Sequence, residues 1–174
     1  MKIRTTVIFL ALSGLILAGC SNKKSDNSSS NTGNNNTQAI AARFKGKTLK
    51  QKAEYLINSN NMDQNKNNDF SPALYKQVVS QLKTKDDSAS QHLLAQVYLR
   101  HGMYKLYNGP VKGNMHEAVT ESLQDFINVL NMEPHNKKAR AEINQILKIY
   151  KTMPNKSVAK ELVPKLQKLG FQVQ

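Results

Sequence analysis

Few residues of this sequence have the types and spacing that chemistry at a protein site requires. The four histidines, His92, His101, His116 and His135, lack metal-ligand spacing with one another. The sequence also contains no Gly-x-Ser-x-Gly nucleophile motif, no His-Glu-x-x-His motif and no Walker-type phosphate loop. We therefore predict no catalytic residue, no cofactor and no enzymatic activity. We expect His92 and His116 at the surface, and His101 in a groove beside Tyr98.

One polar segment has the alternate oxygen-ligand spacing of a calcium-binding loop: Asp63, Asn65, Asn67 and Asp69. Two essential positions of that loop are filled by the wrong residue types. Asn68 stands where the sharp turn needs glycine, and Leu74 stands where the bidentate glutamate belongs. We therefore predict no metal site in this chain.

The N-terminus has the organisation of an export signal. Lys2 and Arg4 precede an apolar run from Thr6 to Leu17, which is about half the length needed to span a bilayer. The run ends in Leu17-Ala18-Gly19-Cys20, which resembles the lipobox of bacterial lipoproteins. The resemblance implies that residues 1–19 are a signal peptide, that Cys20 carries diacylglycerol, and that Cys20 becomes the first mature residue.

An anchor of two or three acyl chains holds a protein stably on a membrane. We therefore expect an exported protein that is lipid-anchored to the bacterial cell membrane. In a Gram-negative host the resemblance implies the outer membrane, because Ser21 and not aspartate follows the cysteine. Of the eighteen residues 21–38, fourteen are Ser, Asn, Thr or Gly, so we expect residues 20–38 to be the lipidated cysteine and a flexible linker.

The remaining chain, residues 39–174, has apolar residues at helical spacing and no convincing strand pattern. It predicts an all-α domain of about six helices, with capping boxes expected at Thr48–Gln51 and Ser88–Gln91. Ser71-Pro72 indicates another helix start, and Pro164 should kink or split the last helix. The expected helices cover 48–59, 71–84, 88–108, 114–131, 136–152 and 157–169.

Two of these helices have a further internal pattern. Leu94, Ala95, Tyr98, Gly102 and Tyr104 resemble the first helix of a tetratricopeptide repeat. The second helix and its closing turn are similar in Glu117-Ala118-Val119, Phe126, Leu130 and Met132-Glu133-Pro134. The span 88–136 is longer than the family's 34 residues, so the repeat is degenerate. The resemblance implies a tetratricopeptide-like stack of antiparallel helical hairpins.

In that family the first helix of each hairpin lines a concave binding face. The resemblance therefore implies a scaffold that binds a protein or peptide partner at the cell envelope. Its candidate contact residues here are Gln96, Arg100, Tyr104, Arg140 and Asn144. Arg100 and Arg140 are expected to clamp a carboxylate through bidentate hydrogen bonds.

The charge pattern supports an alternative function. The net charge is +13, and residues 137–174 hold nine basic and two acidic side chains. Lys160, Lys165 and Lys168 would form a basic patch through which a structural protein adheres to anionic lipid or wall polymer. The same spacing also suits ordinary solvated helix faces. We expect no nucleic-acid partner for an exported, lipid-anchored chain, despite the pI of 9.8.

Overall fold

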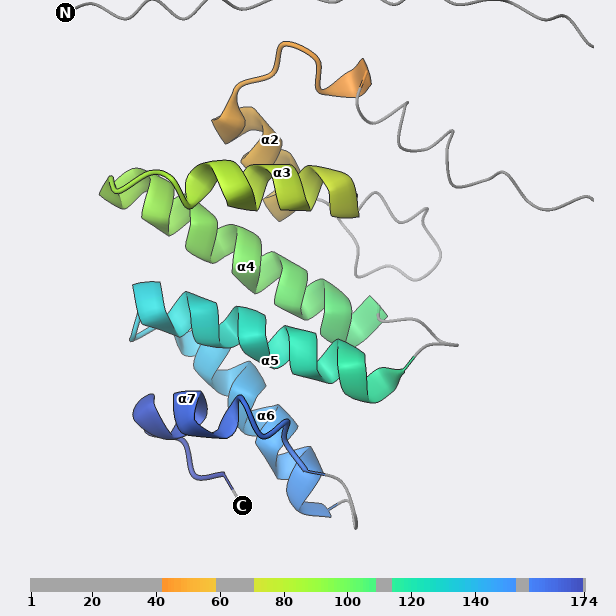
Figure 1. The fold of residues 1–174 in the computed structure, drawn as a ribbon, viewed down its shortest axis with the longest axis vertical. Helices are drawn as coiled ribbons and strands as arrows, with labels where there is room; N and C mark the ends of the chain where they lie inside the picture. Colours follow the sequence, from red (N-terminus) through yellow and green to blue (C-terminus); the bar gives the residue numbers. More distant parts are fainter. Residues whose placement is uncertain (1–41, 59–70, 109–113, 153–156, 174) are drawn as a thin grey trace, which may run out of the picture. The chain divides into compact units, whose positions relative to one another are not determined.

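The computed structural model describes residues 42–58, 71–108, 114–152 and 157–173. Its helices are α2 (Leu49–Asn58), α3 (Pro72–Leu82), α4 (Ser88–Asn108), α5 (Met115–Met132), α6 (Lys137–Thr152) and α7 (Val163–Lys168), as Figure 1 shows. These ranges contain no strand, which confirms an all-α fold with about six helices. The signal peptide, Cys20, the linker and the calcium-like segment predicted above lie outside the described residues.

Two of the predicted helix starts have the expected hydrogen bonds. In the capping box before α2, the Thr48 backbone N–H donates to Gln51 Oε1 (3.0 Å), and the Gln51 backbone N–H donates to Thr48 Oγ1 (3.2 Å). At α3, the Ser71 hydroxyl oxygen accepts from the Leu74 backbone N–H, and Pro72 occupies the first turn. Both starts are therefore set by local sequence.

Two other expectations about helix ends were wrong. The cap of α4 is Asp87 and not Ser88, because Asp87 Oδ1 accepts from the Ser90 backbone N–H at 2.9 Å. The last helix begins at Val163 and not near residue 157. Pro164 lies in its first turn, where the missing N–H costs nothing; in a helix begun at 157 the same residue would break a hydrogen bond.

The most extensive helix contact among the described residues joins α4 and α5. Gly102 of α4 faces the ring of Phe126, and a Cβ added to Gly102 would lie 2.7 Å from Phe126 Cε1. The Ser122 hydroxyl lies 2.9 Å from the carbonyl oxygens of both Gly102 and Ala118, so it bonds to the backbone of both helices. The small residue at position 102 therefore allows the two helices to approach closely.

The other helices pack around this pair. Helix α2 contacts α3 and α4, α3 contacts α4, and α6 packs on α5. The core is continuous and includes Leu56, Leu82, Val97, Leu130 and Ile143, none of which is exposed by more than 1 %. The segment 157–173 completes it with four buried side chains, Val158, Leu162, Leu166 and Phe171. None of the helices in the described ranges is long and apolar enough to cross a membrane.

Candidate functional site

Three of the predicted contact residues lie on one side of α4. Gln96, Arg100 and Tyr104 follow one another at four-residue spacing, and each side chain is half-buried. Gln96 Nε2 lies 2.8 Å from His92 Nε2, and His92 Nδ1 lies 2.5 Å from Glu133 Oε1 at the end of α5. Burial lowers the pKa of the Arg100 guanidinium from its usual value. We call Gln96, Arg100, Tyr104 and Tyr107 the α4 stripe.

The two predicted residues on α6 have different surroundings. The Arg140 guanidinium donates to the backbone carbonyls of Pro134 (2.9 Å) and Leu169 (3.5 Å) and lies 5.4 Å from the ring centroid of Phe171. It therefore holds the C-terminal segment against α6, and these two bonds use two of its five N–H donors. Asn144, one turn further along α6, is exposed.

The α6 residue that meets α4 is Glu142, which the sequence reasoning did not single out. Glu142 is 2 % exposed, and its two carboxylate oxygens accept from the Tyr107 hydroxyl and from Lys138 Nζ, both at 2.7 Å. Burial and the hydrogen bond to Glu142 raise the pKa of Tyr107 to about 12. Glu142 lies 200° around the helix from Asn144, so α6 presents a different face to α4 than the repeat pattern suggested.

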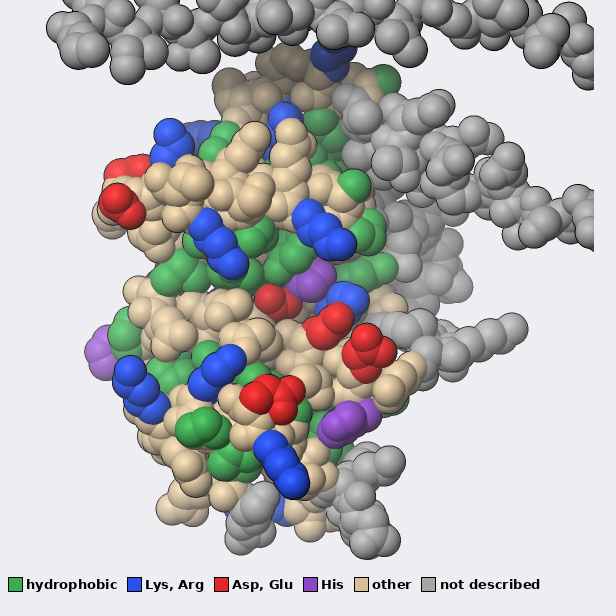
Figure 2. All heavy atoms as spheres, viewed as in Figure 1, with side chains coloured by type: hydrophobic (Ala, Val, Ile, Leu, Met, Phe, Trp, Pro, Cys, Tyr) green, Lys and Arg blue, Asp and Glu red, His purple; other side chains and the backbone are tan. Residues whose placement is uncertain are grey.

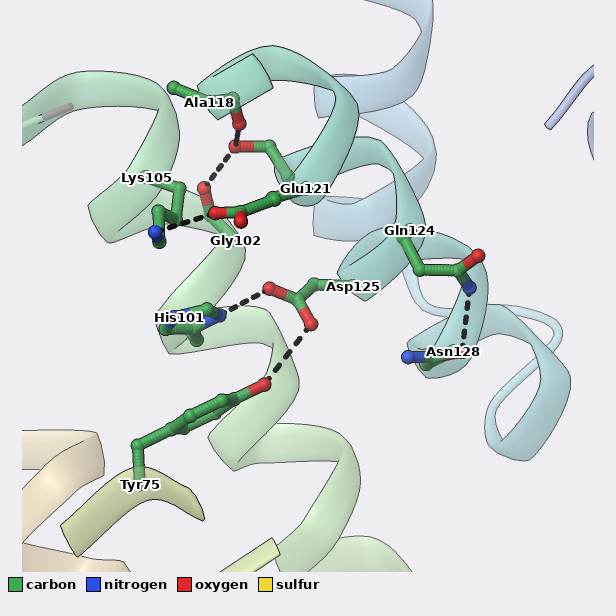
Figure 3. A network of polar contacts seen from close by, with 10 residues as sticks. Tyr75, His101, Gly102, Lys105, Ala118, Glu121, Gln124, Asp125 and Asn128 are labelled. Atoms are coloured by element: carbon green, nitrogen blue, oxygen red, sulfur yellow. Dashed lines mark hydrogen bonds and ion pairs between the residues drawn. The ribbon is translucent and has the colours of Figure 1, made fainter. Parts of the chain in front are cut away.

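A polar cluster that the sequence analysis did not predict joins α3, α4 and α5. Asp125 of α5 bonds to His101 Nδ1 of α4 (2.5 Å) and accepts from the Tyr75 hydroxyl of α3 (3.2 Å), as Figure 3 shows. The His101 and Tyr75 rings stack with centroids 3.8 Å apart and planes inclined by 15°. In Figure 2, histidine and acidic side chains lie side by side at the boundary between α3 and α5.

Burial dominates the electrostatics of this cluster. The side chains of His101 and Asp125 are 12 % and 8 % exposed. Burial raises the pKa of Asp125, although the hydrogen bonds from His101 and Tyr75 act in the opposite direction. Burial and the nearby Asp125 carboxylate raise the pKa of Tyr75 above the ordinary value for tyrosine. His101 therefore lies between two helices and is not a groove-lining residue as predicted.

The hydrogen bonds of this cluster connect helices and have a structural role. One turn back on α5, the Ser122 hydroxyl bonds to two backbone carbonyls. Glu121 on the same side of α5 pairs with Lys105 of α4 at 2.5 Å. Among the residues that the structure describes, no group of three or more His, Cys, Asp or Glu side chains could hold a metal ion.

Three large apolar side chains, one each on α4, α5 and α6, are exposed. In the described ranges the large hydrophobic residues exposed above 40 % are Tyr107 near the end of α4, Met115 at the start of α5 and Ile149 near the end of α6. Tyr107 reaches α6 through Glu142. Met115 and Ile149 are the chain neighbours of His116 and Tyr150, which contact each other at 3.2 Å.

The three lysines of the predicted basic patch are all exposed. Lys165 Nζ donates to Gln124 Oε1 on α5 at 2.6 Å. Lys165 and Lys168 line a hollow between α5 and α7, whereas Lys160 lies in the preceding turn and does not line it. None of the three pairs with an acidic side chain within the described ranges.

Comparison with known proteins identifies no relative. No protein-family model matches the sequence, and no curated protein and no solved structure matches it either.

Proposed function

We propose that this protein is a lipid-anchored, extracytoplasmic helical scaffold that binds a protein or peptide partner at the cell envelope. The sequence Leu17-Ala18-Gly19-Cys20 supports the anchor, and the linker to residue 38 supports a folded part held away from the membrane. The surface that supports partner binding is the α4 stripe together with exposed apolar residues of α5 and α6.

The composition of that surface is the observation that carries the proposal. Tyrosine and arginine are enriched among the residues that contribute most to protein interfaces. The α4 stripe holds Arg100, Tyr104 and Tyr107, and Met115 and Ile149 are 59 % and 43 % exposed. The Tyr107–Glu142 and His116–Tyr150 hydrogen bonds join the helices that carry these exposed side chains. We infer that they belong to one surface, of the kind that exposed apolar patches mark as interaction sites. A partner that covers this surface would bury them.

The internal contacts of this surface make it rigid before a partner arrives. Glu142 fixes Tyr107 from one side, and the His92–Glu133 contact fixes the start of α4 from the other. Side chains that are already ordered lose less conformational freedom on binding, so less of the interaction energy is spent on ordering them.

The anchor is tested separately from the partner. We expect the wild-type chain to incorporate a labelled fatty acid in its host and to sediment with membranes, and Cys20→Ala to do neither. A Cys20→Ala protein that still incorporates the label would rule out lipidation at this residue.

Partner binding is tested by capture from detergent-solubilised envelopes of the host, using the full chain and a high-salt wash. We expect a discrete protein to remain bound to the wild type and to be lost from the double variant Met115→Ser, Ile149→Ser. The matched control is Ala73→Ser, Ala141→Ser, which also replaces two exposed apolar residues. Equal capture by the two double variants would contradict the proposed surface.

Arginine variants test which part of the predicted contact set takes part. We expect Arg100→Ala to weaken capture. Arg140→Ala should lower the stability of the C-terminal segment and leave capture of the same partner within about twofold, because Arg140 already bonds to this chain's own carbonyls. A stronger effect of Arg140→Ala on capture than of Arg100→Ala would contradict this assignment.

A second candidate function is adhesion of the protein to anionic lipid or wall polymer. It is favoured by the exposure of Lys160, Lys165 and Lys168 in the last part of the chain. Adhesion of this kind weakens steeply with salt, because exposed charges are screened within about 8 Å at physiological ionic strength. Retention on anionic vesicles that disappears at high salt would support it, and salt-independent retention would not.

A further inference from the structure

A polar hollow lies between α5 and α7, on a different part of the surface from the α4 stripe. It is lined by Gln124, Ile127, Asn128, Asn131, Lys165 and Lys168 and has a volume of about 260 Å³. Sites for drug-sized ligands are about 300–1,000 Å³, so this hollow suits a single small chemical group. Figure 3 shows that Gln124 and Asn128 project from the side of α5 away from the His101–Asp125 pair.

Hydrogen bonds between the lining residues occupy acceptor oxygens, so the groups that can bond to a ligand are mainly donors. Lys165 Nζ donates to Gln124 Oε1 at 2.6 Å, and Gln124 Nε2 donates to Asn128 Oδ1 at 2.9 Å. Of the three amide oxygens in the lining, those of Gln124 and Asn128 thus already accept bonds from within it, and Asn131 supplies a third amide group. The Asn128 amide nitrogen and the remaining N–H groups of Lys165 are donors. Lys168 adds a second ammonium group, so the hollow is rich in donors.

All the charged side chains that line the hollow are positive. The lining includes two ammonium groups and no carboxylate. The two carboxylates on the neighbouring turns of α5 are engaged elsewhere, because Glu121 pairs with Lys105 and Asp125 bonds to His101. Ile127 is only 1 % exposed and supplies an apolar wall beside the charged groups. Lysine is a common ligand for phosphate, whose oxygens accept from several donors at once.

We propose that this hollow binds a phosphate group, with Lys165 and Lys168 as the charged ligands and Asn128 as a neutral donor. The phosphate is either the headgroup of an anionic lipid or a soluble phosphate ester. If the phosphate belongs to a lipid, this inference rests on adhesion, the second candidate function. If it belongs to a soluble ester, the inference is independent of that function. It requires no protein partner.

The test uses the full chain in a non-ionic detergent that contains no phosphate. One arm titrates soluble glycerol phosphate, and the other adds phosphatidylglycerol to the micelles. The readout is the NMR signals of the Gln124 and Asn128 side-chain amides, which report on the hollow itself and not on other basic surfaces. We expect saturable shifts in at least one arm, and the arm that responds identifies the source of the phosphate.

Charge-matched variants separate the hollow from the general positive charge of the chain. We expect Lys165→Gln, Lys168→Gln to weaken binding about tenfold or more, since it removes both charged ligands of the phosphate and leaves only neutral donors. Lys137→Gln, Lys148→Gln removes the same charge from exposed positions of α6 and should change binding by less than about twofold. Lys168→Gln alone keeps the bond from Lys165 to Gln124, so its loss of affinity cannot come from loosening of α7.

Two results would overturn the inference. Equal losses of affinity in the two double variants would show that binding depends on the overall positive charge. The adhesion function would then remain possible, but the hollow would not be its site. The absence of amide shifts in both arms would exclude the phosphate site, even if the protein still adheres to anionic vesicles. Conversely, shifts with glycerol phosphate and no retention on vesicles would support the hollow and contradict the adhesion function.

Discussion

The close contact between α4 and α5 allows the effect of Gly102→Ala on the free energy of unfolding to be predicted. The new Cβ would lie 2.7 Å from Phe126 Cε1 and 3.1 Å from two further atoms of the same ring. Overpacking a core costs about 1–3 kcal/mol, whereas alanine improves helix propensity over glycine by about 1 kcal/mol. Phe126 is fully buried, so its ring has no free space to move into, and the upper part of the range applies. We expect a net loss of about 1–2 kcal/mol.

Urea unfolding followed by circular dichroism measures this loss, and the thermal midpoint should fall by about 4–8 °C. The control is the double-mutant cycle with Phe126→Leu. The branched side chain leaves room for the new methyl group, so Gly102→Ala should cost at least about 1 kcal/mol less in that background. Wild-type or higher stability of Gly102→Ala, or strictly additive effects in the cycle, would refute the close approach of these helices.

Three further changes test other contacts. Tyr75→Phe should lower the free energy of unfolding by about 1–2 kcal/mol, because it removes a donor to the buried Asp125 carboxylate; an unchanged urea midpoint would contradict that bond. Thr48→Ala should cost about 1 kcal/mol through loss of the capping box, measured in the same way. The pKa of Tyr107 is raised to about 12, so the unfolded chain ionises first and stability should fall between about pH 10 and pH 12. That fall should be smaller in Tyr107→Phe, and ultraviolet titration should show the step near pH 12 disappear.

The helix starts show how far local sequence predicts this fold. Thr48 and Ser71 were identified correctly because a cap and its N–H partner lie three residues apart. At α4 the choice between Asp87 and Ser88 was one residue wrong, because two neighbouring residues both have side chains suited to capping. Pro164 had been expected to interrupt a longer helix, but the chain instead uses its fixed φ to begin a short one.

The contacts between helices were much harder to predict. Asp125 meets Tyr75 across 50 residues and His101 across 24, and hydrophobic periodicity carries no information about polar partners at such separations. The contacts of Arg140 with the C-terminal segment were not predicted, because nothing in its own helix indicates that residues 169–171 fold back onto it. Helical amphipathicity therefore predicted the elements, whereas the candidate site depends on which faces meet in three dimensions.

The bond between Tyr75 and Asp125 has a consequence for the order in which the molecule folds and opens. Helices α4 and α5 are near in sequence and share the most extensive contact, so they can form early at little loop-closure cost. Helix α3 is tied to α5 by one buried hydroxyl across a long chain separation. We expect α3 to dock late and to detach first, so that its amides exchange with deuterium through a partial opening while those of α4 and α5 exchange only on global unfolding.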